Sequence, residues 1–83
     1  MSRSERERIF DDWMADHSGL LFKVVRAFAS TPHDREDLFQ QIALQLWQSI
    51  PRYTTEVTLT TWIYRVAFYA ETGWKRKEAR QIG

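Results

Sequence analysis

The 83-residue sequence contains no cysteine, only three glycines, only two prolines and no long apolar run. Without cysteine it can form neither a disulfide nor a thiolate metal site. Three scattered glycines exclude a glycine-rich phosphate loop and a dinucleotide fingerprint. The opening residues MSRSERER lack the apolar stretch of a signal peptide, and no run reaches the length of a membrane span. We therefore expect a cytoplasmic protein without a membrane partner.

Residues for catalysis are also scarce. His17 and His33 lie 16 positions apart on different predicted elements, and without cysteine they supply at best half of a metal site. Adjacent acidic residues on a helix diverge by about 100°, so the neighbouring pairs do not form an acid–base dyad. We expect a protein that is not an enzyme, with no cofactor and no metal.

The residues that are present predict one all-α domain spanning residues 1–83, a compact bundle of three to four helices. Hydrophobic residues make up 43% and charged residues 28% of the chain, which is typical of a globular protein. Apolar residues recur at helical spacing over about 6–29, and the interruption by His17, Ser18 and Gly19 predicts a kink or a split there, since glycine is unfavourable inside a helix. Thr31 and Pro32 are a helix start signal, Pro51 is a stop signal, and Thr58 is the next N-cap.

Charge is unevenly distributed between the last two predicted helices. Residues 31–50 carry a net charge of −2, whereas residues 51–83 carry +3 together with six of the twelve aromatic side chains. Basic groups interleaved with aromatic rings suit a chain that binds phosphates while stacking on unpaired bases. A cationic helix end favoured by the helix dipole explains the same pattern, and composition alone leaves both interpretations open.

Two motifs in order give a specific resemblance. The segment DREDLFQQIALQLW at 34–47, a short loop, and TWIYRVA at 61–67 resemble region 2 of bacterial sigma factors of the sigma-70 family, in particular the extracytoplasmic-function group. The resemblance covers about residues 10–80. It implies a domain that binds core RNA polymerase and opens promoter DNA, in a bundle of three to four helices.

The resemblance assigns the acidic second helix to the clamp helices of the largest polymerase subunit. The matching residues are Asp37, Gln40, Gln41, Leu44 and Trp47. Exposed amides and a carboxylate around apolar anchors are what such an interface needs. For Trp47, a core position and an interface position remain equally open.

The loop and the third helix match the part of the family that captures an unpaired base of the promoter −10 element. Opening the duplex costs a few kcal/mol per base, which a pocket and stacking surfaces must offset. The residues that we expect to bind DNA are Arg52, Tyr53, Thr54, Thr55, Thr58, Trp62, Tyr64, Arg65, Tyr69, Lys75 and Arg76. Among these, Arg65, Lys75 and Arg76 are candidates for phosphate contacts, and Lys77 is a further one. Trp62 fits equally well an apolar stripe of the third helix that we expect to face inward, with Leu59, Ile63, Val66, Ala67, Ala70 and Trp74. The second helix has a similar stripe of Leu38, Phe39, Ile42, Ala43, Leu46, Trp47 and Ile50.

Some positions depart from the family pattern. The family often has asparagine where this chain has Tyr69, a polar or acidic residue where it has Gly73, and glutamate where it has Gln41. At Phe39 and Ala43, the large and the small side chain look exchanged relative to the family pattern. Because the positions of Tyr69 and Gly73 bear on base preference, the promoter sequence that family members recognise cannot be assigned to this chain. The region 4 helix-turn-helix domain that follows in the family has no counterpart here, so we expect either an excised domain or a chain that consists of region 2 alone, and the abrupt end at 81–83 favours the excised domain.

Two further possibilities are kept open. The resemblance allows an anti-sigma factor as a third partner that covers the same surfaces. A rival function is a helical protein–protein interaction or regulatory module, such as a polymerase-binding adaptor, that has the fold but does not melt DNA.

Overall fold

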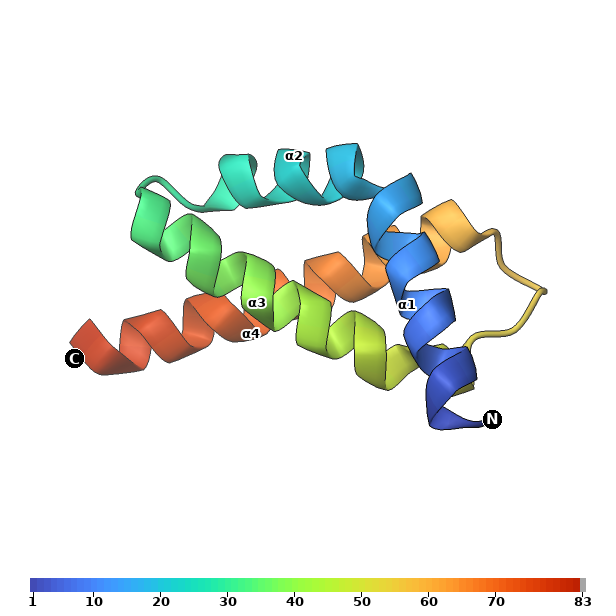
Figure 1. Cartoon of the computed structure of the whole chain (residues 1–83). Helices are drawn as coiled ribbons and strands as arrows, with labels where there is room; N and C mark the ends of the chain where they lie inside the picture. Colours follow the sequence, from blue (N-terminus) through green and yellow to red (C-terminus); the bar gives the residue numbers. More distant parts are fainter. Residues whose placement is uncertain (83) are drawn as a thin grey trace.

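A computed structural model describes the backbone of residues 1–82 and the side chains of residues 1–77. Within this part, four α-helices and one 3-10 helix follow one another: α1 (Arg3–Asp16), α2 (Ser18–Phe28), α3 (Pro32–Ser49), η1 (Ile50–Arg52) and α4 (Leu59–Ile82). Figure 1 shows α3 and α4 crossing, with α2 along one side and α1 at the end. This confirms the all-α bundle. The excised-domain expectation rests on residues 81–83, which lie outside the described side chains.

The first predicted helix is two helices, and the break lies at His17, the first residue of the predicted interruption at 17–19. His17 has φ −121° and ψ 19°, outside the helical range. Its N–H still donates to the Trp13 carbonyl and its carbonyl accepts from Leu21, both at 3.1 Å, so few hydrogen bonds are lost at the corner. Gly19 lies inside α2, and a Cβ there would meet nothing within 4 Å. No neighbouring segment therefore comes close enough to require a glycine at position 19.

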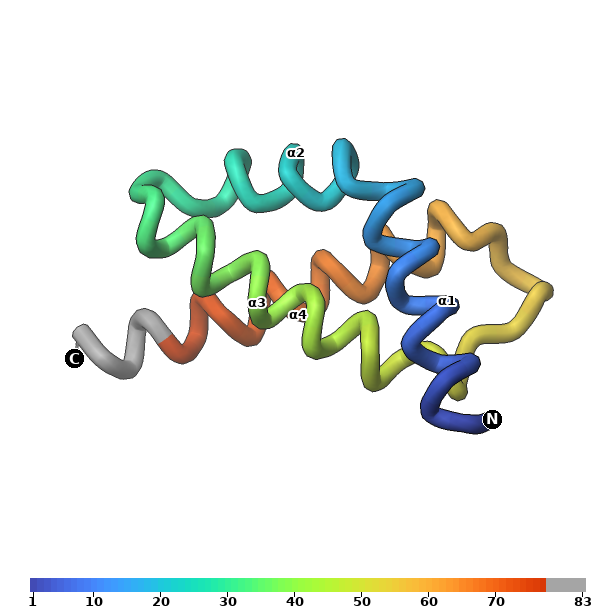
Figure 2. The backbone as a smooth tube through the Cα atoms, viewed as in Figure 1, coloured from blue at the N-terminus to red at the C-terminus, as the bar shows by residue number. Residues whose placement is uncertain are grey.

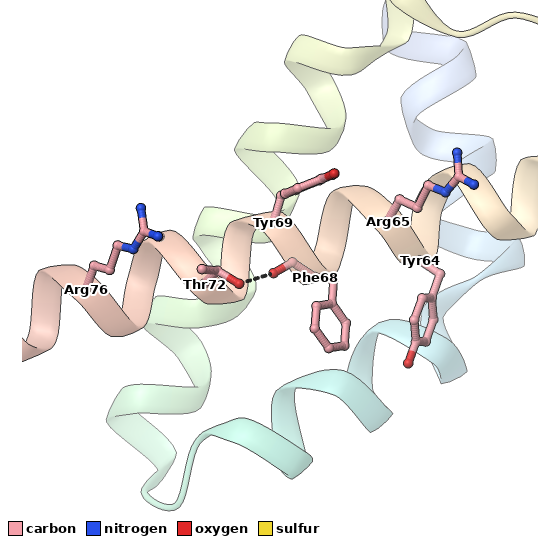
Figure 3. A pocket seen from close by; sticks show the side chains of 7 residues that line it. Tyr64, Arg65, Phe68, Tyr69, Thr72 and Arg76 are labelled. Carbon is pink, nitrogen blue, oxygen red and sulfur yellow. Dashed lines mark hydrogen bonds between the residues drawn. The ribbon is translucent and has the colours of Figure 1, made fainter.

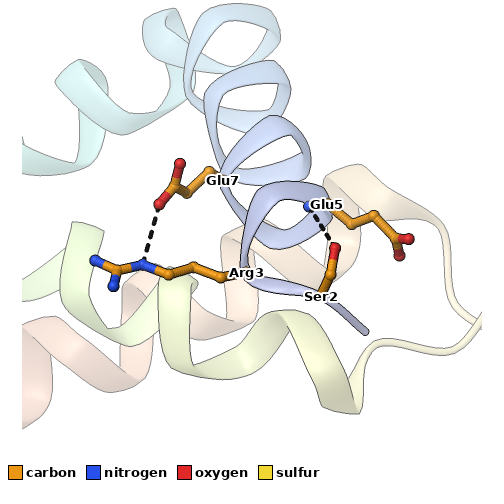
Figure 4. A network of polar contacts seen from close by, with 4 residues as sticks. All are labelled: Ser2, Arg3, Glu5 and Glu7. Carbon is orange, nitrogen blue, oxygen red and sulfur yellow. Dashed lines mark hydrogen bonds and ion pairs between the residues drawn. The ribbon is translucent and has the colours of Figure 1, made fainter.

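Hydroxyl caps set the starts of α1, α3 and α4, whereas α2 follows His17 without a side-chain cap. Thr31 Oγ1 accepts from the Asp34 amide at 3.1 Å, and Thr58 Oγ1 accepts from the Thr61 amide at 3.3 Å, as both sequence signals predicted. Ser2 caps α1 in the same way, and an exposed Arg3–Glu7 ion pair follows it (Figure 4). At the other end of α3, the helix stops at Ser49 and Pro51 lies inside η1. Pro51 thus acts as the predicted stop signal.

One core joins all four helices. The largest fully buried apolar side chains come from α2, α3 and α4: Leu21, Leu38, Ile42, Leu46 and Ile63. α3 packs most extensively against α4. Figure 2 shows that the N-terminal part of the chain lies beside the end of α3 and η1, although these segments are far apart in the sequence. The inward stripes predicted for the second and third helices are therefore confirmed, and each helix keeps an outward face.

Candidate functional site

The outward face of α3 is polar with one apolar residue at its centre. Leu44 is 48% exposed, and Gln40 is exposed beside it, one helical turn away. Gln41 and Asp37 are half-buried at the edge of this face. The structure thus brings four of the five predicted polymerase residues together on one side of one helix.

Asp37 is already engaged within the protein. Its Oδ2 accepts a 2.7 Å hydrogen bond from the indole N–H of Trp74, a buried residue of α4. The bond joins the polar face of α3 to the next helix and holds the carboxylate in one orientation. Asp37 therefore has a structural partner as well as an outward position.

Trp47 lies one turn beyond Leu44 on α3, where α1 packs against it. Its ring meets Phe10 edge-on with centroids 5.6 Å apart, and the Arg6 guanidinium lies 4.5 Å from its centre. Arg6 also donates two hydrogen bonds to the Trp47 carbonyl, at 3.1 Å from Nε and 2.6 Å from Nη2. This carbonyl belongs to the last turn of α3, where it lacks a helical partner. The geometry favours the core role for Trp47, and its contact with polymerase remains a prediction.

The loop between η1 and α4 combines fixed ends with an exposed middle. Thr54, Thr55 and Glu56 are exposed, as is Arg52 at the end of η1. Tyr53, in contrast, is half-buried and donates its hydroxyl to the Val57 carbonyl at 2.9 Å. Thr58 uses its hydroxyl to cap α4 and to bond Thr61 Oγ1 at 2.8 Å. Among the predicted loop residues, Thr54 and Thr55 present their side chains outward.

Trp62 is half-buried against the core, and its polar atom is occupied. The indole N–H donates to Ser49 Oγ at 3.2 Å, and Ser49 Oγ donates to the Leu46 carbonyl at 2.8 Å. The ring also lies 5.5 Å from that of Tyr53. This network favours the inward alternative, and a DNA contact by Trp62 remains a prediction.

The outward face of α4 carries aromatic and cationic side chains together (Figure 3). They line an open hollow of about 820 Å³: Tyr64, Arg65, Phe68, Tyr69, Thr72, Gly73 and Arg76. Figure 3 shows Tyr64 and Phe68 on the side nearest α2, with Tyr69 and the two arginines on the opposite side. Tyr69 is 76% exposed. Four residues predicted for DNA binding thus gather on this face.

Sequence reasoning missed that α2 extends the aromatic half of this face. The Phe68 ring contacts that of Phe28 in α2 edge-on at 5.7 Å, and it lies 5.8 Å from that of Tyr64. The only sequence signal for Phe28 was its place in an apolar stripe. Its role depends on how α2 packs against α4, which local spacing does not specify.

Lys75 is exposed, but it differs from the other predicted phosphate ligands because its ammonium group already has a partner in the protein. Its Nζ lies 3.2 Å from Glu71 Oε1 and 4.8 Å from the centre of the Phe28 ring. Glu71 is only 3% exposed, and Lys75 is the one cation within ion-pairing distance of it among the described side chains. A buried carboxylate that loses its counterion is costly, so Lys75 has a structural task. Arg65 and Arg76 lie on the exposed face, and Lys77 is exposed.

The family follows from comparison with known proteins. The family model "Sigma-70 region 2" matches residues 13–81. The chain belongs to the sigma-70 region 2 family. This is a family of non-enzymatic domains of transcription initiation factors, which bind core RNA polymerase and promoter DNA. The extracytoplasmic-function subgroup stays a prediction.

No curated protein and no solved structure matches this sigma region 2 domain. Within the described residues, none of the helices has the length and apolar character needed to span a membrane.

Proposed function

We propose that this sigma region 2 domain binds the clamp helices of core RNA polymerase through α3, and captures the non-template strand of the promoter −10 element through the loop and α4. The observation that supports the proposal best is the placement of two unlike outward faces on adjacent helices. One is a polar face around Leu44, and the other is an aromatic and cationic face around Tyr69. Such a domain works in the cytoplasm, where polymerase and promoters are.

The polymerase half of the proposal rests on how α3 is supported. Its inner side is buried in the core through Leu38, Ile42 and Leu46, so its outer side is held rigidly. An exposed leucine flanked by amides can enter a shallow pocket between two helices while the amides satisfy polar groups at the rim. The bond from Trp74 fixes the Asp37 carboxylate at the edge of this surface.

The DNA half rests on the chemistry of α4. Unpaired bases bind by stacking on aromatic faces, at about 1–3 kcal/mol per base, and the phosphates between them require cations. Tyr69 offers an exposed ring, and Arg65 and Arg76 lie on the same face one to two turns away. The exposed hydroxyls of Thr54 and Thr55 can donate to and accept from base edges at the adjoining loop.

The test is the binding of fluorescent single-stranded oligonucleotides that resemble −10 elements, titrated with salt. We expect binding that weakens as salt rises, with a double-logarithmic slope of about −0.7 per neutralised phosphate. Duplexes of the same sequence should bind more weakly, because their bases are stacked and paired. Core polymerase should bind the same protein sample.

The rival adaptor function predicts a different result. If the domain is an adaptor, it should bind core polymerase normally, while its binding to single-stranded DNA should be absent or independent of salt. That outcome would contradict the DNA half of the proposal and retain the polymerase half.

A further inference from the structure

Tyr53 occupies the first position of the exposed loop and is fixed there by its backbone and its ring. Its N–H donates to the Ile50 carbonyl at 3.2 Å, which closes η1. Its ring meets Trp13 of α1 edge-on with centroids 5.6 Å apart, and on another side it lies 5.5 Å from Trp62 of α4. The ring is therefore held by helices that lie on both sides of the loop in sequence.

The hydroxyl of the same side chain reaches the far end of the loop. It donates to the Val57 carbonyl at 2.9 Å, across four residues of chain. Val57 is half-buried, and Thr58 immediately after it caps α4. The three exposed residues, Thr54, Thr55 and Glu56, are thus held between two points that one tyrosine joins.

We propose that the Tyr53 hydroxyl is a positioning group that holds residues 54–56 in the shape that receives an unpaired base. The inference rests on the proposed function and assigns Tyr53 a different part in it from a direct DNA contact. Tyr53 is half-buried and donates its hydroxyl hydrogen to the Val57 carbonyl, so its one hydrogen-bond donor acts on the loop and not on a base.

The physical reason is pre-organisation. A loop that must become ordered when it binds loses conformational entropy, and this loss weakens binding. The phenol bond shortens the free segment to three residues before any ligand arrives. A phenylalanine at this position keeps the ring contacts to Trp13 and Trp62 and removes only the closure. The substitution Tyr53→Phe therefore isolates the proposed effect.

The test uses single-stranded oligonucleotides that carry one abasic site, moved through the sequence one position at a time. Removing the captured base keeps the phosphates, so the ratio of intact to abasic affinity measures base capture alone. At the most sensitive position, we expect a penalty of about tenfold or more for the wild-type chain bound to core polymerase. In Tyr53→Phe this penalty should shrink by about three- to tenfold, the value of one net hydrogen bond. The salt slope should not change, because no charge is removed.

Two controls separate positioning from general stability. Val25→Ala truncates a buried residue of α2 and lowers stability away from the loop, so it should leave the abasic penalty unchanged. Hydrogen exchange of the amides of residues 54–57 should quicken in Tyr53→Phe more than exchange of the α3 amides. A merely structural role would quicken both alike.

The possible outcomes distinguish the two claims. If Tyr53→Phe keeps the wild-type abasic penalty, the positioning role is wrong while the proposed function stands. If the wild-type chain shows no abasic penalty at any position, base capture itself is contradicted, and the positioning role with it. A smaller penalty in Tyr53→Phe, with Val25→Ala unchanged, supports both.

Discussion

The outward faces of α3 and α4 lie on adjacent helices that share one core, yet they carry opposite chemistry. The α3 face presents Leu44 among amides and a carboxylate, whereas the α4 face presents Tyr69, Phe68 and two arginines. Their inner sides resemble each other, because both bury aliphatic stripes. The difference shows that the core constrains mainly the inner sides, which leaves most of each outer side able to serve a separate partner.

The two faces are also physically connected. The Trp74–Asp37 hydrogen bond links the buried side of α4 to the edge of the α3 face at 2.7 Å. The two helices therefore form one rigid support, and a substitution on the exposed part of either face should leave the other face in place. The predictions below use this expectation, from the largest effect to the smallest.

The largest effect is expected at Leu44. Leu44→Asp places a charge where the clamp helices would cover an apolar side chain, and we expect at least about a 30-fold loss of affinity for core polymerase, as for an interface anchor. Isothermal titration or fluorescence anisotropy measures this. Ala27→Asp adds the same charge to an exposed position of α2 and should bind normally. Equal losses in both variants would show that the added charge, rather than the α3 face, is responsible.

The next effect concerns the two arginines of α4. Replacing Arg65 and Arg76 together by glutamine should lower the affinity for single-stranded DNA on the order of tenfold and reduce the salt slope by about 1.4. The matched control removes two exposed arginines elsewhere, Arg8 and Arg26. An unchanged salt slope in the α4 variant would show that these arginines do not contact phosphates.

Lys75 sharpens the comparison because it lies beside that face, is exposed, and pairs with the buried Glu71. Lys75→Gln should leave the salt slope nearly unchanged and instead lower stability by about 1 kcal/mol, between the values for exposed and fully buried ion pairs. For a domain of this size that is a fall of roughly 4–8 °C in Tm. A lowered salt slope at unchanged Tm would place Lys75 among the phosphate ligands after all.

The smallest effect is a gain in stability. A Cβ at Gly73 meets nothing within 4 Å, and the residue lies inside α4, so Gly73→Ala should raise stability by about 0.5–1 kcal/mol. Thermal unfolding measures the gain. Gly19→Ala, equally open but near the start of α2, should gain less. A loss of stability in Gly73→Ala would mean that the end of α4 is not helical in solution.

Local signals predicted the starts of α3 and α4 and the inward stripes well. Thr31 and Thr58 cap α3 and α4 as predicted from the sequence, because an N-cap involves atoms only three residues apart. The break falls within the interruption predicted at 17–19, although the backbone leaves the helical range at His17 and not at Gly19, because the direction of a helix after a corner depends on what it packs against.

The ambiguous aromatic residues needed the three-dimensional structure. Trp62 fitted an inward stripe and a DNA-binding segment equally well, and its partner Ser49 lies 13 residues away. Tyr53 meets Trp13 from the opposite end of the chain. Glu71 entered the sequence argument only as a charge, and its burial beside Lys75 depends on the packing of α4. Local spacing cannot reveal contacts of this kind.

Simultaneous binding tests the central claim that the two faces serve separate partners. The measurement is the affinity for a labelled single-stranded −10 oligonucleotide with and without a saturating fragment that contains the clamp helices of the largest polymerase subunit. The account predicts that the fragment binds and that the two dissociation constants agree within about twofold, since separate sites more than a few side chains apart act independently. Displacement of the oligonucleotide by the fragment, or a fragment that does not bind at all, would contradict it.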